Sequence, residues 1–232
     1  MMKPDRKTAI IIGILLIFSF IFGVFSSVPA LERPDYLEAL PQIETQVLVA
    51  TILQAAMAVV YVSITVLLYP ILETYNKKLA VGYFGFRIIG AGFLFAGIAF
   101  LLLLLSLSQS FVTSSQASSS YFEIAEMLRQ GRDILNHIGM ILPWSIGGVI
   151  LYYCFFHMRL IPRWLSIWGM IGSFFTLFAT LMLMLNIIQL VSPVYFILNA
   201  PVAFCEIILA IMLIVRGFHS IEIKTNEKEV RI

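Results

Sequence analysis

The sequence predicts an all-α membrane protein, with six transmembrane helices in a single domain. Of its 232 residues, 60% are hydrophobic and only 12% are charged. The mean hydropathy of +0.97 is far above that of a soluble domain. The hydrophobic residues form six runs that are each long enough to cross a hydrocarbon layer of about 30 Å as a helix. These runs cover about residues 8–28, 47–70, 80–107, 134–156, 165–190 and 195–216.

The first run follows the basic residues Lys3, Arg6 and Lys7. Small residues near its end would suit cleavage of a signal peptide. However, its apolar core spans about 20 residues, and signal-peptide cores have about 7–15. We therefore interpret the run as a retained transmembrane helix.

The second and third runs each contain one strongly polar residue. Gln54 lies about two turns into the second run, and Arg87 lies a turn or two inside the start of the third. Gly92 and Ala96 in the third run have the four-residue spacing that permits close contact between membrane helices. Glycine-bearing faces of this kind suit a homo-oligomer as well as an internal bundle.

The segment between the third and fourth runs is polar. Residues 109–120 are rich in serine and predict a flexible connection. In residues 121–133, apolar and charged side chains alternate with a helical period, which is typical of a helix on the membrane surface. After the sixth run, residues 217–232 predict a polar cytoplasmic tail.

The distribution of basic residues predicts the orientation. With the N-terminus inside, eleven basic residues fall in inside segments and only Arg33, Arg129 and Arg132 in outside loops. Cytoplasmic loops of membrane proteins carry such an excess. We therefore expect a multi-pass protein of the cytoplasmic membrane with both termini cytoplasmic.

The composition also excludes several partners and cofactors. A net charge of +2, with the basic residues scattered in short loops, does not indicate nucleic-acid binding. Cys154 and Cys205 both lie in apolar runs and predict no structural disulfide. No phosphate-binding glycine loop, paired-cysteine motif or haem-type histidine pair is present. We expect no cofactor and no metal, and the lipid bilayer is the main partner.

Glu206 is the strongest candidate for a functional residue, because it lies about ten residues from either end of the sixth run. A charge at that depth costs several kcal/mol unless it is paired or protonated. Arg87 lies roughly 8–10 Å inside the same membrane face and Glu206 about 15 Å, so an ion pair is conceivable. We predict a polar core of Arg87, Glu206, Gln54 and Asn199, in which Pro201 opens the helix near Asn199.

Asp133 and His137 form a secondary candidate site, because a four-residue spacing lets a carboxylate orient an imidazole. A satisfied polar helix entrance is the favoured explanation of the pair over a metal or proton site, because two ligands do not make a metal site. His137, His157 and His219 are expected at different depths from Ser145, which disfavours a hydrolase. An enzyme is therefore the least favoured class.

Three strings resemble a known family: residues 79–89, which include Arg87, residues 159–169, and residues 201–206 together with 214–218. They are similar to bacterial and archaeal six-helix membrane proteins catalogued only as a domain of unknown function. Arg87, Asp133 and Glu206 match polar positions of that family pattern. Many of its members have glutamate where this chain has Gln54, and this departure weakens the case for a two-carboxylate site. The resemblance implies the fold and supplies no reaction.

Two functions remain open. The first is proton-coupled transport or small-molecule binding around a buried pair formed by Glu206 and Arg87. The alternative is a non-catalytic structural, sensory or immunity-type protein, in which this pair only fixes helix packing. A cavity that reaches Glu206 would favour the first, and a dry, tightly packed site would favour the second.

Overall fold

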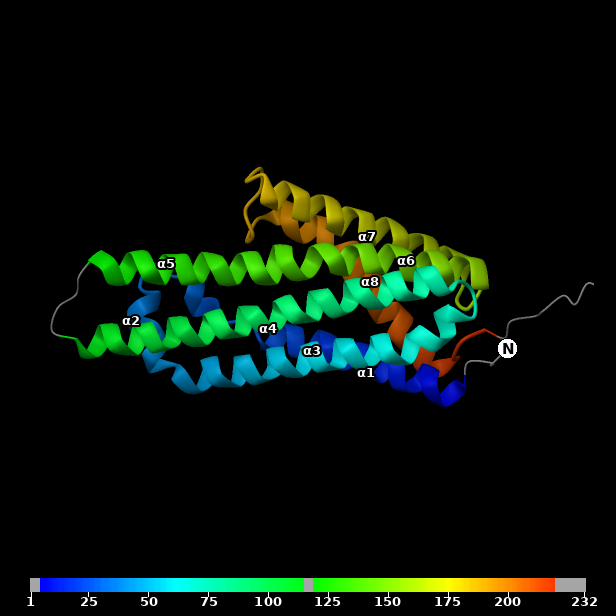
Figure 1. The fold of residues 1–232 in the computed structure, drawn as a ribbon, viewed down its shortest axis with the longest axis horizontal. Coiled ribbons are helices and arrows are strands. Elements are labelled where there is room, and N and C mark those ends of the chain that lie inside the picture. The colour runs from blue at the N-terminus through cyan, green and yellow to red at the C-terminus, as the bar shows by residue number, and fades with distance from the viewer. Residues whose placement is uncertain (1–4, 115–118, 220–232) are drawn as a thin grey trace, which may run out of the picture.

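The computed structural model describes residues 5–114 and 119–219, and in these residues every regular element is a helix (Figure 1). The predicted tail lies mostly outside the described residues, which end at His219. The elements are α1 (Arg6–Phe25), η1 (Pro29–Glu32), α2 (Tyr36–Gln42), α3 (Glu44–Glu73), α4 (Lys77–Thr113), α5 (Ser119–Asp133), the π-helical turn η2 (Ile134–Met140), α6 (Ile141–Met158), α7 (Arg163–Met184) and α8 (Pro193–Val215).

Six helices in the described residues are long and apolar enough to cross a membrane, which confirms the predicted fold class. One of them is the continuous helix Ser120–Met158, which runs through α5, η2 and α6. Both ends of the described chain lie at the same end of the bundle, where the His219 N–H donates to the Leu160 carbonyl at 2.8 Å. We call this the terminal end, and we call the opposite end, with residues 26–43 and 185–192, the loop end.

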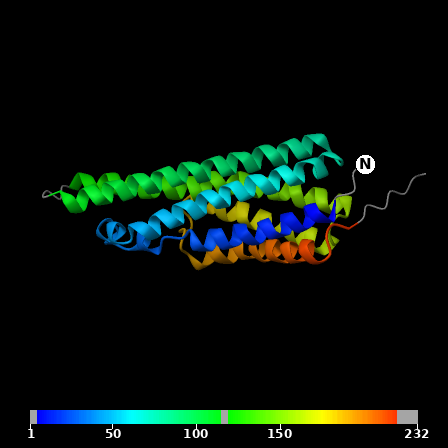
Figure 2. The same ribbon diagram turned by 90° about the horizontal axis from the view of Figure 1, so that it is seen from below.

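The six long helices form a closed ring. Each packs against the next in the order α1, α3, α4, α6, α7, α8, and α8 returns to pack along α1 (Figure 2). Small residues allow the last contact, because a Cβ at Gly13 of α1 would lie 2.7 Å from the carbonyl oxygen of Ala210 on α8. A large apolar cluster fills the terminal half of the ring, and a second one fills the loop end.

The helices α4 and α5 extend farther than the others at the loop end (Figure 1). At 1.5 Å per residue, the 37 residues of α4 span about 55 Å, well beyond the hydrocarbon thickness. The segment predicted to be a surface helix is in fact a coaxial extension of α6. One side of it packs against α4, because Ala125 is fully buried in the cluster that contains Leu104 and Phe111. By contrast, Phe122, Ile124 and Met127 are exposed.

Helix ends in the structure follow local capping chemistry rather than the ends of the apolar runs. Asn76 begins α4 three residues earlier than expected, because its Oδ1 accepts a hydrogen bond from the Leu79 N–H at 3.2 Å. At the other extreme, α7 ends at Met184 although the apolar run continues. Asn186 adopts a left-handed φ of 55°, and the Ile187 N–H donates to the Met182 carbonyl at 2.9 Å.

The glycines of α4 that lie close to a neighbouring helix do not include Gly92, which the sequence paired with Ala96 as a helix contact. Gly92 is exposed, and nothing lies within 4 Å of a Cβ built on it. The close approach occurs instead at Gly90 and Gly97, which face η2. The face of Gly92 is therefore open on the outside of the ring.

Candidate functional site

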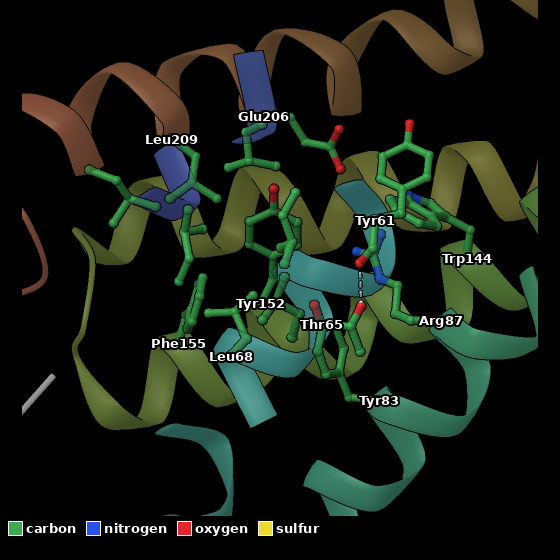
Figure 3. Close-up of a pocket in the computed structure, with 15 residues that line it drawn as sticks. Tyr61, Thr65, Leu68, Tyr83, Arg87, Trp144, Tyr152, Phe155, Glu206 and Leu209 are labelled. Atoms are coloured by element: carbon green, nitrogen blue, oxygen red, sulfur yellow. Dashed lines mark hydrogen bonds between the residues drawn. The ribbon is translucent and has the colours of Figure 1, made fainter. Parts of the chain in front are cut away.

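The centre of the ring contains one arginine and one acid, and both come from predicted positions. Arg87 projects from α4 and Glu206 from α8 (Figure 3). Because α4 begins at Lys77, Arg87 lies about 15 Å from the start of its helix, and Glu206 lies about 14 Å from the end of α8. The two residues thus share a depth, whereas the sequence placed Arg87 nearer to the membrane surface.

Aromatic rings hold the Arg87 side chain. Its guanidinium carbon lies 3.5 Å from the centre of the Trp144 ring and 5.4 Å from that of Tyr83. Arg87 is only 5% exposed, and its Nε has no hydrogen-bond partner. Gly147 on α6 makes room for it, because a Cβ there would lie 3.3 Å from the Arg87 Nε. The cation is therefore stabilised mainly by π faces.

Glu206 reaches from α8 toward the group formed by Tyr61, Trp144 and Arg87 (Figure 3). The side chain is half-buried. Within the described residues it forms no ion pair with Arg87, although it interacts electrostatically with the guanidinium and with the Trp144 side chain. The free space between these groups is about 20 Å³, which is enough for one water molecule.

A second space, which we call the lateral crevice, reaches Glu206 from the outside of the ring. It has a volume of about 350 Å³ and lies between the loop-end halves of α1 and α8, with Trp144 at its back. Asn199 lines it, as the sequence predicted for a neighbour of Glu206, and the Asn199 Nδ2 donates to the Tyr195 carbonyl at 2.8 Å. Pro201 lies within α8 between Asn199 and Glu206, where it removes one helical hydrogen bond.

The structure does not bring Gln54 to Glu206. Gln54 lies on α3 seven residues before Tyr61, which is about 10 Å along a helix. It lines a third space of about 410 Å³ toward the loop end, which we call the loop-end cavity. Gly23 and Met140 belong to the walls of both the loop-end cavity and the lateral crevice.

Among the described residues, no hydrogen bond or ion pair joins the secondary candidates Asp133 and His137. Asp133 pairs with Arg132 at 3.0 Å and with Arg129 at 3.6 Å. His137 lines the loop-end cavity, and its Nδ1 lies 3.3 Å from the Tyr195 hydroxyl. The Asp133 carboxylate, which the sequence assigned to the His137 imidazole, thus pairs with two arginines of α5 instead.

Sequence reasoning missed the two aromatic residues at the ring centre, Tyr61 and Trp144. Their rings pack with centroids 3.9 Å apart. A signal for Trp144 was available, because tryptophan prefers the membrane interface and this one lies well inside an apolar run. Glu32 and Arg132 in the loop-end cavity carried no comparable signal, since both lie in predicted loop or surface segments.

The described residues contain no cluster of three or more metal-ligating side chains. Cys154 and Cys205 are buried free thiols, and the Cys205 Sγ lies 3.6 Å from the Tyr152 hydroxyl. The groups available near Glu206 are a carboxylate, a guanidinium, an indole and phenols. These groups can hold a proton, a water molecule or a charge.

A family model described as "Domain of unknown function (DUF4386)" matches residues 11–217. The matched residues include all six membrane-spanning helices except the first five residues of α1. No curated protein and no solved structure matches the chain.

Proposed function

This chain belongs to the family described as "Domain of unknown function (DUF4386)", and we propose that it is a proton-coupled membrane protein of the transporter type, with Glu206 as its proton-binding group. The observation that carries this proposal is the geometry of the ring centre. A half-buried carboxylate lies near a guanidinium and is not joined to it by an ion pair.

A carboxylate in hydrocarbon is kept either neutral by a proton or charged by a nearby cation. Both partners are available to Glu206. Arg87 supplies the cation, and the lateral crevice supplies a route by which water can bring or remove a proton. Because Arg87 rests on Trp144, it does not need Glu206 as a partner. When Glu206 releases its proton, the nearby Arg87 guanidinium can stabilise the negative charge of the carboxylate.

The sizes of the spaces support proton binding at the ring centre and small-molecule binding in the two outer spaces. The ring centre, at about 20 Å³, has room for a water molecule and not for an organic solute. The two outer spaces, at about 350 and about 410 Å³, fall in the range of small-molecule sites. Their shared wall at Gly23 and Met140 provides a connection from the loop end toward Glu206.

The basic residues support a cytoplasmic position for the terminal end. Lys77, Lys78, Arg159, Arg163 and Arg216 all lie there, in keeping with the excess of positive charge in cytoplasmic loops. In this orientation the loop-end cavity opens on the opposite side of the cytoplasmic membrane.

A structural role for the pair is the alternative, and one observation favours it. Arg87 packs against Trp144, Tyr83 and Gly147, so this member of the pair helps to join α4 to α6. In that case the substitution Glu206→Gln changes stability in detergent and leaves no pH-dependent process to lose.

Fluorescence of Trp144 can distinguish these functions. In a Trp164→Phe/Trp168→Phe background, Trp144 is the only tryptophan, since the chain has three. We expect its emission to titrate with pH in lipid nanodiscs, because the charge of Glu206 changes beside the indole. Glu206→Gln should abolish that titration, and Glu73→Gln at the terminal end should preserve it. An emission that does not change with pH, or that titrates equally in Glu206→Gln, would contradict the proposal.

A further inference from the structure

We infer that the loop-end cavity is a binding site for a small zwitterionic group, in which an ammonium lies close to an anionic oxygen. This inference names a ligand class for one of the two outer spaces of the proposed function, and it does not require that Glu206 bind a proton. The cavity is lined by residues of α1, η1, α3, α4, α5, η2 and α8, and Glu206 is not among them.

The cavity is unusual for its unsatisfied polar groups. Three residues that line it have a buried polar atom without a hydrogen-bond partner: the Oε1 of Gln54, the Nε of Arg132 and the Oδ1 of Asn136. These residues are only 5%, 9% and 4% exposed. Each unmade hydrogen bond of this kind costs about 1–3 kcal/mol. The Asn136 Oδ1 packs against Gly97 of α4, so the unpaired atoms of Gln54 and Arg132 are the two that indicate a missing ligand.

The charges at the cavity define the ligand at its anionic end. Arg132 donates from Nη1 to Asp133 at 3.0 Å, so its position is fixed while its Nε stays free. Asp133 is shared with Arg129, which also pairs with Glu126 at 2.7 Å, so what is left unmatched is the Nε–H of Arg132 rather than a surplus charge. An anionic oxygen of a ligand supplies the missing acceptor for the Nε.

The opposite charge is provided by Glu32. This exposed carboxylate lines the cavity, and in the described part of the chain it forms no ion pair. It lies close enough to Arg132 to interact with it electrostatically. An ammonium group can meet Glu32 and donate to the Oε1 of Gln54. A purely anionic or purely cationic ligand would leave one of these two ends unmatched.

The π-helical turn η2 shapes the wall of this site. It carries Asn136 and His137, and turns of this type often occur where a helix serves a function. Asn136 fits only because α4 has a glycine opposite it, since a Cβ at Gly97 would lie 2.0 Å from the Asn136 Oδ1. His137 is held by Tyr195. The polar wall is thus fixed before any ligand arrives.

Apolar residues complete the cavity, among them Met57, Leu94 and Met140. They suit the carbon skeleton of the ligand. The same ammonium-and-anion chemistry occurs in free amino acids and in the headgroup of phosphatidylethanolamine. The cavity lies toward the loop end, where either source can reach it.

Thermal unfolding of the full chain in detergent tests this inference, with three additions made separately: a set of free neutral amino acids, phosphatidylethanolamine and phosphatidylglycerol. A ligand that binds only the folded state raises the melting temperature, and the rise grows with the logarithm of the ligand concentration above its Kd. We expect stabilisation by at least one amino acid or by phosphatidylethanolamine, and none by phosphatidylglycerol, which lacks the ammonium. The amino acids identify a free solute as the source, and phosphatidylethanolamine identifies a lipid headgroup.

Gln54→Leu is the decisive variant. It removes an unsatisfied buried group, so the ligand-free protein should be as stable as the wild type or more so. Loss of one charge-assisted hydrogen bond should nevertheless weaken apparent affinity by about tenfold to about 100-fold. Gln46→Leu, at an exposed position of the same helix, should keep the wild-type affinity. Glu206→Gln should keep it as well, which separates this site from the proposed function.

Three outcomes would overturn the inference. The first is that neither amino acids nor phosphatidylethanolamine stabilise the wild type. The second is that phosphatidylglycerol stabilises it as well as phosphatidylethanolamine does. The third is that Gln54→Leu and Gln46→Leu respond to the ligand in the same way.

Discussion

The guanidinium of Arg87 stacks on the indole of Trp144, with 3.5 Å between the guanidinium carbon and the ring centre. This contact explains how a cation is held in the ring centre without an ion pair. Cation–π stacking is strongest on tryptophan and increases when water is excluded. Because the stacking satisfies Arg87, the carboxylate of Glu206 remains available for protonation.

Arg87→Lys tests the stacking. Lysine keeps the charge and loses the flat guanidinium that lies on the ring, so the two residues are not equivalent here. We expect a loss of about 1–2 kcal/mol in the free energy of unfolding, measured as a lower melting temperature in detergent. Arg163→Lys is the matched control, because Arg163 is exposed and its guanidinium carbon lies 5.2 Å from the Phe156 ring centre. Equal melting temperatures for the two variants would argue against a special role of the stacking.

Gly97→Ala tests the contact between α4 and η2. The added Cβ would overlap the Asn136 side chain, and overpacking of this kind costs about 1–3 kcal/mol. Gly92→Ala, on the same helix with open space around it, should be neutral or stabilising. Melting temperatures of the two variants should therefore differ in the stated direction.

A second substitution identifies the source of that cost. Asn136→Ala removes the overlapping group, so combining it with Gly97→Ala should recover part of the lost stability. If the double variant is as unstable as the sum of the single variants, the overlap is not the cause.

Cysteine labelling tests the proposed orientation. In a Cys154→Ala/Cys205→Ala background, Ser27→Cys places a thiol at the loop end and Lys78→Cys places one at the terminal end, both at exposed positions. A membrane-impermeant maleimide should label Ser27→Cys in spheroplasts. It should label Lys78→Cys only after the membrane is permeabilised. The reverse pattern would show that the termini face outward.

The fold was largely predictable, because six apolar runs of sufficient length determine six helices, and the structure confirms this number in the described residues. The ends of the helices were less predictable. Asn76 extends α4 toward the terminal end, and Asn186 stops α7 inside an apolar run. Both effects come from single side chains or backbone conformations that hydropathy does not register.

The depth of Glu206 was predictable, and the surroundings of Glu206 were not. Counting residues from a helix end places Glu206 near mid-membrane, and the structure puts Arg87 at the same depth. Residue counting did not place the other candidates as well, because Arg87 lies deeper than expected and Gln54 lies about 10 Å farther along its helix, at another cavity. Trp144 was missed for a related reason, because its role depends on the neighbour that α4 brings to it.

The most direct test of the central claim is infrared difference spectroscopy of the full chain in lipid, recorded as the pH is changed. A protonated carboxyl group has a C=O stretch that the ionised group lacks, and few acids lie within the membrane helices. Because the chain has 13 acidic residues, other carboxyl groups also contribute bands as the pH falls. We predict one carboxyl component that is present in the wild type and in Glu73→Gln and is absent in Glu206→Gln. Identical carboxyl bands in the wild type and in Glu206→Gln, over the pH range in which the protein stays folded, would contradict the account.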